Sequence, residues 1–269
     1  MPAYRCPVCT SALDADLAGF ECVNRHRFDR AREGYVNLLP GGRLKGRPAG
    51  DSDAMVRARR TVFDAGLYRP VVDAVAAGVA DTGARAVLDC GCGEGAYLAA
   101  ASARGAADGW GIDVSKPAVR LAARRHQGLH FAVASSYALP FEDDVFDAVL
   151  SVFSPRPFAE MMRVLVPGGA AIVVTPGADH LHQLKALIYD EPRPHAAPTD
   201  AADSPDSEWP SPNEVREVRF DIDLDEPSLR TALLEMTPFW WSTPPARQRV
   251  VEEQAATVTV DMLVAIYHC

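Results

Sequence analysis

The sequence contains no apolar run long enough to cross a membrane, and its opening residues lack the charged-then-apolar build of a signal peptide. It also lacks internal repeats. Its six cysteines do not form the framework of a secreted disulfide-rich protein, because three lie near the N-terminus and two flank Gly91. These absences predict a cytoplasmic protein with reduced thiols. The 269 residues, 48% of them hydrophobic, are enough for one large α/β domain with an appendage.

The net charge of −9 argues against a protein that binds nucleic acid through a general positive field. The charge is unevenly distributed, however. Residues 25–60 hold ten Arg or Lys and four Asp or Glu, a local charge of +6 that leaves −15 for the remainder. This asymmetry predicts a basic N-terminal face that can hold phosphates, joined to an acidic body. A solvated charged surface without a partner is the alternative.

Four potential metal ligands lie within the first 30 residues. Cys6 and Cys9 are separated by two residues, twelve residues follow, and Cys22 and His26 are then separated by three. Two residues between thiolates allow one turn to present both sulfurs to a tetrahedral ion. The spacing therefore predicts a structural zinc site near the N-terminus, with chance pairing of cysteines as the alternative. A closed shell of four protein ligands leaves no position for a reactive water, so this zinc is not expected to be catalytic.

A buried strand is expected to lead into the run VLDCGCGEG at 87–95, where three glycines alternate with other residues. Glycines let the backbone pass close to a ligand, and a helix is expected to begin near residue 96. The spacing G-x-G-x-G differs from the dinucleotide pattern, and the two acids would repel a pyrophosphate but suit a cationic cofactor with an amino group. The loop therefore predicts binding of S-adenosylmethionine, and a turn without a ligand is the alternative. The loop residues expected at the cofactor are Asp89, Gly91, Gly93, Glu94 and Gly95.

The residues after this loop continue a strand–helix pattern. A second strand over 109–113 ends at Asp113, which is expected to accept hydrogen bonds from the ribose hydroxyls; a surface Asp at a strand end is the alternative. Because ligands of open α/β sheets lie beyond the carboxyl ends of the strands, the loop that follows a strand over 145–152 should face the methyl group. Phe153 and Ser154 in that loop are the candidate catalytic residues.

Further elements are expected before and after this core. A helix beginning near residue 54 would place Arg57 and Arg60 one turn apart on a face that contacts a nucleic-acid backbone. Residues 190–217, rich in Pro, Asp and Ser, predict a flexible lid or connector. The other expected elements are helices over 116–126, 158–165 and 228–235, strands over 129–133 and 170–175, a turn at 167–169, and an antiparallel strand pair over 218–224 and 256–267.

Longer motifs in this chain resemble the RlmA-type 23S ribosomal RNA guanine-N1 methyltransferases, a family that includes macrolide-resistance members. The resemblance covers nearly the whole chain. It rests on C-P-V-C with C-x₃-H, FDRAREGYVNLLP at 28–40, M-x-x-A-R-R at 55–60, D-x-G-C-G-E-G, V-A-S-S with L-P-F, T-P-G-x-x-H-L at 175–181 and M-T-P-F at 236–239.

The resemblance implies a small zinc-binding domain that recognises an RNA hairpin, joined to an α/β class I S-adenosylmethionine-dependent methyltransferase domain with a Rossmann-like, mostly parallel seven-stranded sheet. The implied domains cover 1–40 and 81–269, with a basic linker and helices over 41–80. The implied zinc ligands are Cys6, Cys9, Cys22 and His26. The cofactor contacts carried over are Tyr68, Gly95, Ala96 and His180, with Ser135 of the V-A-S-S motif added to them.

The expected reaction is methyl transfer to N1 of a guanine in a 23S ribosomal RNA hairpin, held by the basic 25–60 region. A base splayed out of the hairpin would stack on Phe153, Tyr137 or Trp240, and His180 is a candidate for removing the N1 proton. The residues at 153–154 and the acidic 190–217 segment depart from the family pattern, which leaves a methyltransferase of a small molecule as one alternative. A non-enzymatic zinc-bearing RNA-binding protein is another. A homodimer formed through the zinc-bearing segment is a further expectation.

Overall fold

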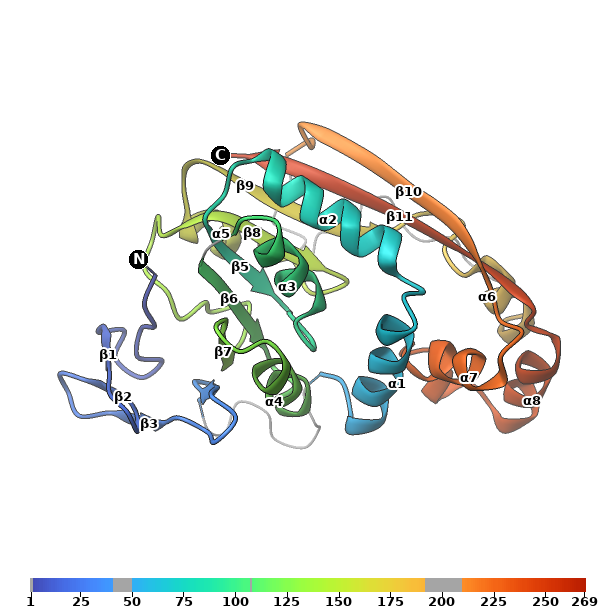
Figure 1. The fold of residues 1–269 in the computed structure, drawn as a ribbon, viewed down its shortest axis with the longest axis horizontal. Helices are drawn as coiled ribbons and strands as arrows, with labels where there is room; N and C mark the ends of the chain where they lie inside the picture. Colours follow the sequence, from blue (N-terminus) through green and yellow to red (C-terminus); the bar gives the residue numbers. More distant parts are fainter. Residues whose placement is uncertain (1, 41–49, 107, 192–209) are drawn as a thin grey trace.

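The protein is built on one large twisted sheet, seen in a computed structural model that describes residues 2–40, 50–106, 108–191 and 210–269 (Figure 1). Among these residues the sheet has eight strands in the order β10-β11-β9-β8-β5-β6-β7-β4. Their bounds are β4 Val36–Asn37, β5 Ala86–Cys90, β6 Asp108–Asp113, β7 His130–Val133, β8 Phe146–Val152, β9 Leu165–Pro176, β10 Glu214–Asp223 and β11 Thr257–His268.

The strands from β4 to β9 are parallel, whereas β11 pairs antiparallel with both β9 and β10. This arrangement confirms the predicted α/β fold class with a mostly parallel sheet. The sheet has one strand more than the seven expected, because Val36 and Asn37 of the N-terminal segment pair with Ala132 and Val133 of β7. A strand of two residues is too short to show the alternation by which strands are recognised in a sequence.

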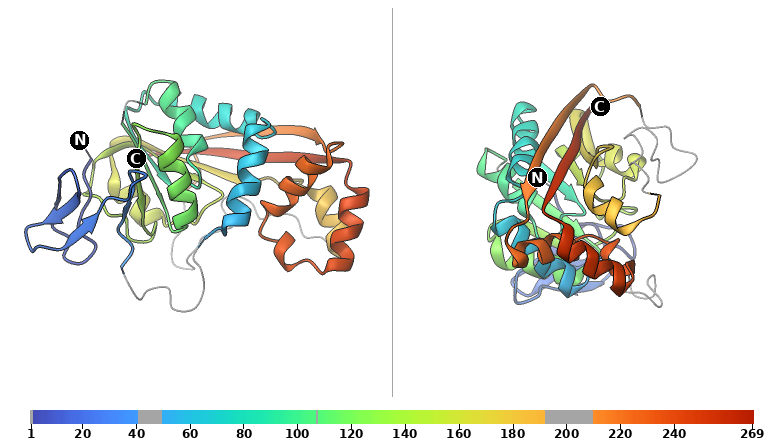
Figure 2. Two further views of the ribbon diagram at one scale, coloured as in Figure 1. Left: turned by 60° about the horizontal axis from the view of Figure 1, so that its bottom comes forward. Right: turned by 90° about the vertical axis from the view of Figure 1, so that its right-hand side faces the viewer.

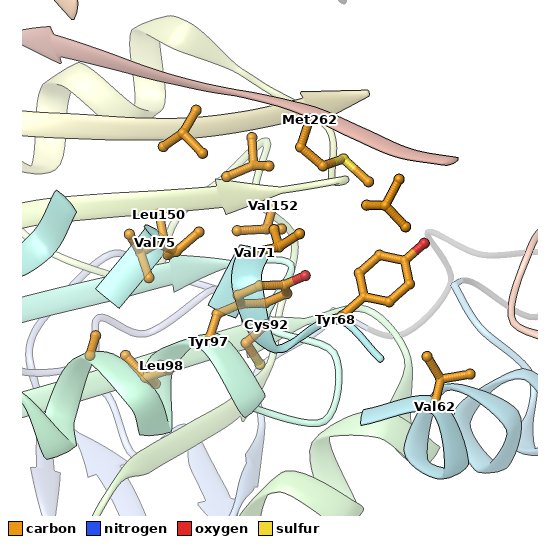
Figure 3. Packing of buried hydrophobic residues seen from close by; sticks show 14 of the residues in the cluster. Val62, Tyr68, Val71, Val75, Cys92, Tyr97, Leu98, Leu150, Val152 and Met262 are labelled. Carbon is orange, nitrogen blue, oxygen red and sulfur yellow. The ribbon is translucent and has the colours of Figure 1, made fainter. Parts of the chain in front are cut away.

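Helices cover both faces of the sheet (Figure 2). One face carries α2 Arg69–Asp81, α3 Ala96–Ala103 and α4 Lys116–Arg125, and the other carries α5 Phe158–Val164 and α6 His182–Ile188. Successive strand side chains point to opposite faces, so Val87 packs under α2 and α3 while Leu88 belongs to the core on the other side. Figure 3 shows part of the first core, with Val71 and Val75 of α2 against Leu150 of β8.

The N-terminal segment forms a small sheet of β1 Leu13–Ala15, β2 Gly19–Cys22 and β3 Arg27–Asp29. Its apolar side chains share a core with the large sheet. The Tyr4 ring meets the Trp110 ring edge to face at 4.9 Å and the Phe20 ring at 5.3 Å, and Tyr4 also forms a bridge with Phe141. A segment of this size has little core of its own, and here its apolar side chains pack against the core of the large sheet.

The C-terminal part contains the helix expected over 228–235 and two further helical elements that were not predicted from the sequence. Between β10 and β11 the chain forms α7 Pro227–Glu235, which is the expected helix, the 3₁₀ turn η1 Trp240–Ser242 and α8 Pro245–Gln254. Helix α1, Asp53–Asp64, packs against α7, and Ser52 caps α1 by accepting a hydrogen bond from the Met55 amide. No helix within the described ranges is long and apolar enough to span a membrane.

Two predicted boundaries were wrong. The segment expected to be a flexible connector over 190–217 contains the first residues of β10, which begins at Glu214. The charged residues Glu214, Arg216 and Glu217 gave the start of this edge strand the composition of a loop. Residues 192–209 of that prediction lie outside the described part of the chain. The expected turn at 167–169 lies within β9, whose pairing with β8 shifts register between Phe146 and Ala148.

Candidate functional site

The glycine loop, the end of β6 and the loop after β8 meet at the carboxyl edge of the sheet. Strand β5 lies between β6 and β8, so the loops that follow these three strands are neighbours. The Gly93 amide donates to Asp113 Oδ2 at 2.9 Å, and Ser154 Oγ donates to the Cys90 carbonyl at 2.5 Å. The sequence-predicted residues at 89–95, 113 and 153–154 are therefore brought together.

Two glycines of the loop are required by its conformation. Gly91 has φ +87°, and a Cβ there would lie 2.4 Å from the Ser154 Cβ. Gly95 has φ +84° and precedes Ala96 at the start of α3. A Cβ at Gly95 would lie 2.9 Å from the His126 ring, which is too close. Both positions combine a left-handed backbone with a neighbour that fills the space of a side chain. The loop is thus a rigid turn that keeps its amides and carbonyls near the strand ends.

Asp89 is the buried acid at the centre of the site. Its side chain is 1% exposed, and neither carboxylate oxygen has a hydrogen-bond partner among the described residues. Burial, with a smaller contribution from the Asp113 charge, raises the pKa of Asp89 to about 8. A buried carboxylate without a partner is costly, whereas a bound ammonium group would supply the missing hydrogen bonds. This unpaired acid fits a cofactor with an amino group.

The other two acids of the site already have partners. Asp113 accepts from the Gly93 amide and, through Oδ1, from the Ser115 amide at 2.7 Å; burial raises the pKa of Asp113. Glu94 is 4% exposed and forms an ion pair with Arg60 of α1, Oε2 to Nη1 3.2 Å. Burial raises the pKa of Glu94 and the Arg60 contact opposes this. Glu94 therefore connects the glycine loop to α1.

Phe153 is held in an unusual conformation at the end of β8. Its φ is +53°, which is strained for an aromatic residue, and its side chain is 47% exposed. The Phe153 ring stacks on the His180 ring with centroids 6.2 Å apart. Ser154 Oγ also lies 2.9 Å from Ser151 Oγ, so two hydrogen bonds fix the backbone that follows the ring. An exposed, pre-positioned aromatic next to a cofactor loop is suited to stacking on a planar base.

His180 is mostly buried, with 8% of its side chain exposed. The Asp261 amide donates to His180 Nδ1 at 3.4 Å. A nitrogen that accepts from an amide cannot carry the ring proton, so the neutral ring has its proton on Nε2 and presents a donor there. Asp261 was not singled out in the sequence; its carboxylate accepts from the Asp179 amide at 2.9 Å and so fixes the T-P-G-x-x-H-L turn.

Tyr68 and Ser135 occupy different surroundings. Tyr68 is 2% exposed and stacks on Phe63 at 5.9 Å, close to Tyr97 and Val71 in the core under the glycine loop (Figure 3). Burial raises the pKa of Tyr68. Ser135 accepts from the Tyr137 amide at 3.2 Å and lines a cavity of about 300 Å³. The wall of that cavity also includes Cys6, Pro7, Leu38, Glu160 and Arg163.

The four predicted metal ligands are gathered in one cluster. One ligand atom from each of Cys6, Cys9, Cys22 and His26 lies within 4.8 Å of the others. The Cys9 and Cys22 sulfurs are 3.6 Å apart, and both Cys6 and Cys22 sulfurs lie 3.5 Å from His26 Nδ1. A tetrahedral zinc with sulfur ligands at about 2.3 Å requires sulfur–sulfur edges of roughly 3.8 Å. The donor set and the spacing therefore fit zinc.

Two expectations about RNA-contacting residues were wrong. Arg60 is paired with Glu94 and with Asp64, so it does not form a free basic face with Arg57. Trp240 is only 5% exposed and cannot stack on an incoming base, whereas Tyr137 is 57% exposed. Arg60 pairs with Asp64 one turn later in α1 and with Glu94 of the glycine loop, and only the second contact lies beyond the reach of spacing within one helix. The burial of Trp240 likewise depends on packing between segments that are far apart in the sequence.

The sheet order, the glycine loop with its unpaired acid and the cysteine–histidine cluster define a zinc-bearing S-adenosylmethionine-dependent methyltransferase. Residues 4–45 match the family model described as RlmA, N-terminal, and residues 87–169 match a methyltransferase domain model. The "Putative 23S rRNA (guanine-N(1)-)-methyltransferase YxjB" of Bacillus subtilis is 36% identical over 98% of this chain and 96% of its own.

Two further relatives carry the same kind of name. The "Putative 23S rRNA (guanine-N(1)-)-methyltransferase" of Micromonospora griseorubida is 36% identical over 99% of this chain and 97% of its own. The 23S rRNA (guanine(748)-N(1))-methyltransferase of Streptomyces fradiae is 42% identical over 67% of this chain and 65% of its own. The chain belongs to the RlmA-type family of 23S rRNA guanine-N1 methyltransferases, which confirms the family predicted from its motifs.

Proposed function

We propose that this protein transfers a methyl group from S-adenosylmethionine to N1 of a guanine in a 23S ribosomal RNA hairpin. The observation that carries the proposal is the exposed Phe153, held at positive φ by the Ser154 hydrogen bonds directly beside the cofactor loop. The full-length similarity to relatives named for this reaction supports the RNA substrate. Such a substrate places the activity in the cytoplasm.

The chain's own residues would hold both groups in place. Cys6, Cys9, Cys22 and His26 would hold the zinc, and the bound S-adenosylmethionine supplies a methyl group on a sulfonium. Asp89 would accept from its ammonium and Asp113 from its ribose hydroxyls. The further residues of the predicted cofactor set are Tyr68, Gly91, Gly93, Glu94, Gly95, Ala96, Ser135 and His180.

Guanine N1 would attack the methyl group in line, so the protein's main contribution is positioning. The N1 proton must leave as N1 becomes nucleophilic. His180 is poorly suited to accept it, because its Nδ1 already accepts from the Asp261 amide and its Nε2 carries the proton. We infer that the N1 proton leaves to water.

The direct test is methyl transfer from labelled S-adenosylmethionine to unmodified 23S RNA, mapped by reverse-transcriptase stops, since a methyl on N1 blocks the pairing edge. We expect a stop at one hairpin guanine. Cofactor binding without incorporation into RNA would contradict the proposal and favour a small-molecule substrate. The expected homodimer stays a prediction, which sedimentation of the purified protein tests.

Phe153→Ala is expected to slow methyl transfer while leaving cofactor affinity nearly unchanged. Stacking of a base on an aromatic ring is worth about 1–3 kcal/mol, which corresponds to a loss of about 5- to 150-fold in kcat/KM. Steady-state kinetics and cofactor titration measure the two effects separately. Trp241→Ala is the control, because Trp241 is similarly exposed, at 50%, on a different part of the surface. A parallel loss of cofactor binding in Phe153→Ala would contradict the placement of the ring.

Affinity for S-adenosylmethionine is expected to rise with pH between about 6 and 8. Asp89, with its pKa raised to about 8, is protonated over this range in the free protein, and a cationic ligand requires its carboxylate. Binding therefore releases a proton, and affinity increases by up to about tenfold per pH unit. The raised pKa of Asp89 makes the stability of the ligand-free protein depend on pH in the opposite direction. The free energy of unfolding falls as pH rises from the unfolded-state pKa of Asp towards 8, because the unfolded chain loses this proton first.

Calorimetric titration in buffers of different ionisation enthalpy measures the released proton. Asp89→Asn should weaken binding and remove most of the pH dependence below pH 8. A pH slope that Asp89→Asn leaves intact would show that another group, such as Asp113, takes the role.

A further inference from the structure

Helix α4 carries a row of cations that no acid on the helix balances. Lys116, Arg120 and Arg124 follow each other at intervals of four residues, so they lie on one face, and all three are exposed. The opposite face of α4, formed by Ala118, Val119, Ala122 and Ala123, is buried against the sheet. The helix contains no Asp or Glu. In a chain with a net charge of −9, such a row stands out.

Residues of the basic 25–60 region lie at both ends of this helix. At the start of α4, Ser115 Oγ donates to the Asp51 carbonyl at 2.7 Å. At its end, residues Arg32 and Glu33 form a groove of about 320 Å³ together with Ala123, Arg124 and Gln127. Figure 1 and Figure 2 show α4 between the N-terminal strands and α1. The cations of α4 thus lie between two parts of the 25–60 region.

The acids near this row neutralise it only in part. Glu33 has 16% of its side chain exposed and approaches the Arg32 guanidinium at 3.7 Å, while Arg32 itself is 93% exposed. Asp53 lies 3.5 Å from Arg120, but both side chains are about half exposed or more, and pairs in that setting interact weakly. Arg124 stands in the last turn of α4, where the helix dipole favours a cation.

We propose that Lys116, Arg120 and Arg124, continued by Arg32 across the groove, form a track for the phosphate backbone of the RNA substrate. Four residues along a helix advance by about 6 Å, so the row offers evenly spaced cations to successive phosphates of one strand. Phosphate contacts of this kind set the position and orientation of a nucleic acid without reading its sequence. The track extends the RNA-binding surface from the N-terminal segment onto the methyltransferase domain. It rests on the proposed function, since it concerns how the same substrate is held.

The test compares two variants that each lose three positive charges. The first variant, called the α4 variant, combines Lys116→Gln, Arg120→Gln and Arg124→Gln. The control combines Arg85→Gln, Arg104→Gln and Arg249→Gln, which are exposed residues outside α4. Binding of a 23S RNA hairpin is measured at several salt concentrations, together with kcat, KM for RNA and the dissociation constant of S-adenosylmethionine.

The α4 variant is expected to bind RNA about 10- to 100-fold more weakly and to lower the slope of log affinity against log salt by about 2–3. Its kcat at saturating RNA and its affinity for S-adenosylmethionine should match those of the unaltered protein, which also shows that the fold is intact. The control variant should keep the original slope.

Two results would overturn the track and leave the proposed function standing. One is an equal loss of RNA affinity in both variants. The other is no loss of RNA affinity in the α4 variant while the unaltered protein still methylates RNA. Failure of the unaltered protein to bind or methylate RNA would overturn the proposed function and the track with it.

Discussion

Cys22→Ala is expected to release the zinc, lower the melting temperature and abolish methyl transfer to RNA. Cys22 contributes one of four clustered ligand atoms, and a structural zinc supplies folding free energy on the order of 10 kcal/mol to a small domain. Loss of a structural metal is among the changes that cost more than about 4 kcal/mol, and each kcal/mol shifts the melting temperature of a chain of this size by about 2–4 °C. A decrease of roughly 10 °C or more is therefore expected.

The effect should extend beyond the N-terminal segment, because that segment is part of the main core. Tyr4 packs on Trp110 of β6 and on Phe141, and Leu38 donates its amide to the Val133 carbonyl at the end of β7. Unfolding of the zinc-bearing segment would uncover this face of the sheet and the strand that leads towards Ser135. Affinity for S-adenosylmethionine should consequently fall as well.

Zinc content, thermal unfolding and cofactor titration measure these three effects. Cys269→Ala is the matched control, since Cys269 is exposed at the C-terminal end of the chain and should change none of them. If Cys22→Ala lost zinc but kept both the melting temperature and the cofactor affinity, the N-terminal segment would be an independent unit, contrary to its shared core.

The sequence contained enough local information to locate the cofactor loop, the metal ligands and most of the parallel strands. The spacing of Cys6, Cys9, Cys22 and His26 needs no tertiary knowledge, because knuckle turns place such ligands at fixed offsets. The glycines at 91 and 95 were similarly visible, and their positive φ values explain why glycine stands there.

Other features depend on contacts between distant segments and could not be predicted in this way. The pairing of Glu94 with Arg60 joins residues 34 positions apart, and the hydrogen bond from the Asp261 amide to His180 spans 81 positions. The short strand β4 exists only because β7 offers it an edge. The cations of α4 have a clear period of four in the sequence, but their position between two parts of the basic segment emerges only from the fold.

Gly91→Ala is expected to reduce methyl transfer about 100-fold and to weaken binding of S-adenosylmethionine, because it displaces the glycine loop, the loop that carries Phe153, or both. An alanine at φ +87° is strained by about 1–2 kcal/mol, and its Cβ would lie 2.4 Å from the Ser154 Cβ. Contacts that short do not occur, so either the glycine loop or residues 153–154 must move. Loss of the hydrogen bond from Ser154 to the Cys90 carbonyl would follow, and with it the fixed position of the aromatic ring.

Gly83→Ala separates backbone strain from this steric effect. Gly83 has φ +69° and no heavy atom within 4 Å of the position of a Cβ, so its substitution reports the cost of the left-handed conformation alone. We expect Gly83→Ala to lower stability slightly and to leave kinetics unchanged. Ser154→Gly removes the Cβ that an alanine at 91 would meet, so the double variant Gly91→Ala with Ser154→Gly should recover part of the cofactor affinity lost in Gly91→Ala.

The recovery is measured as a double-mutant cycle on cofactor affinity and on the free energy of unfolding. Additive effects of the two substitutions would show that the close approach of residues 91 and 154 does not join the cofactor loop to the methyl-acceptor loop. A favourable coupling would show that it does, because Ser154→Gly removes the side chain that the new Cβ at position 91 would meet. The cofactor loop and the loop that carries Phe153 would then be positioned by one shared contact, and a backbone displacement in either loop would alter the other, whereas removal of the Phe153 ring alone would not.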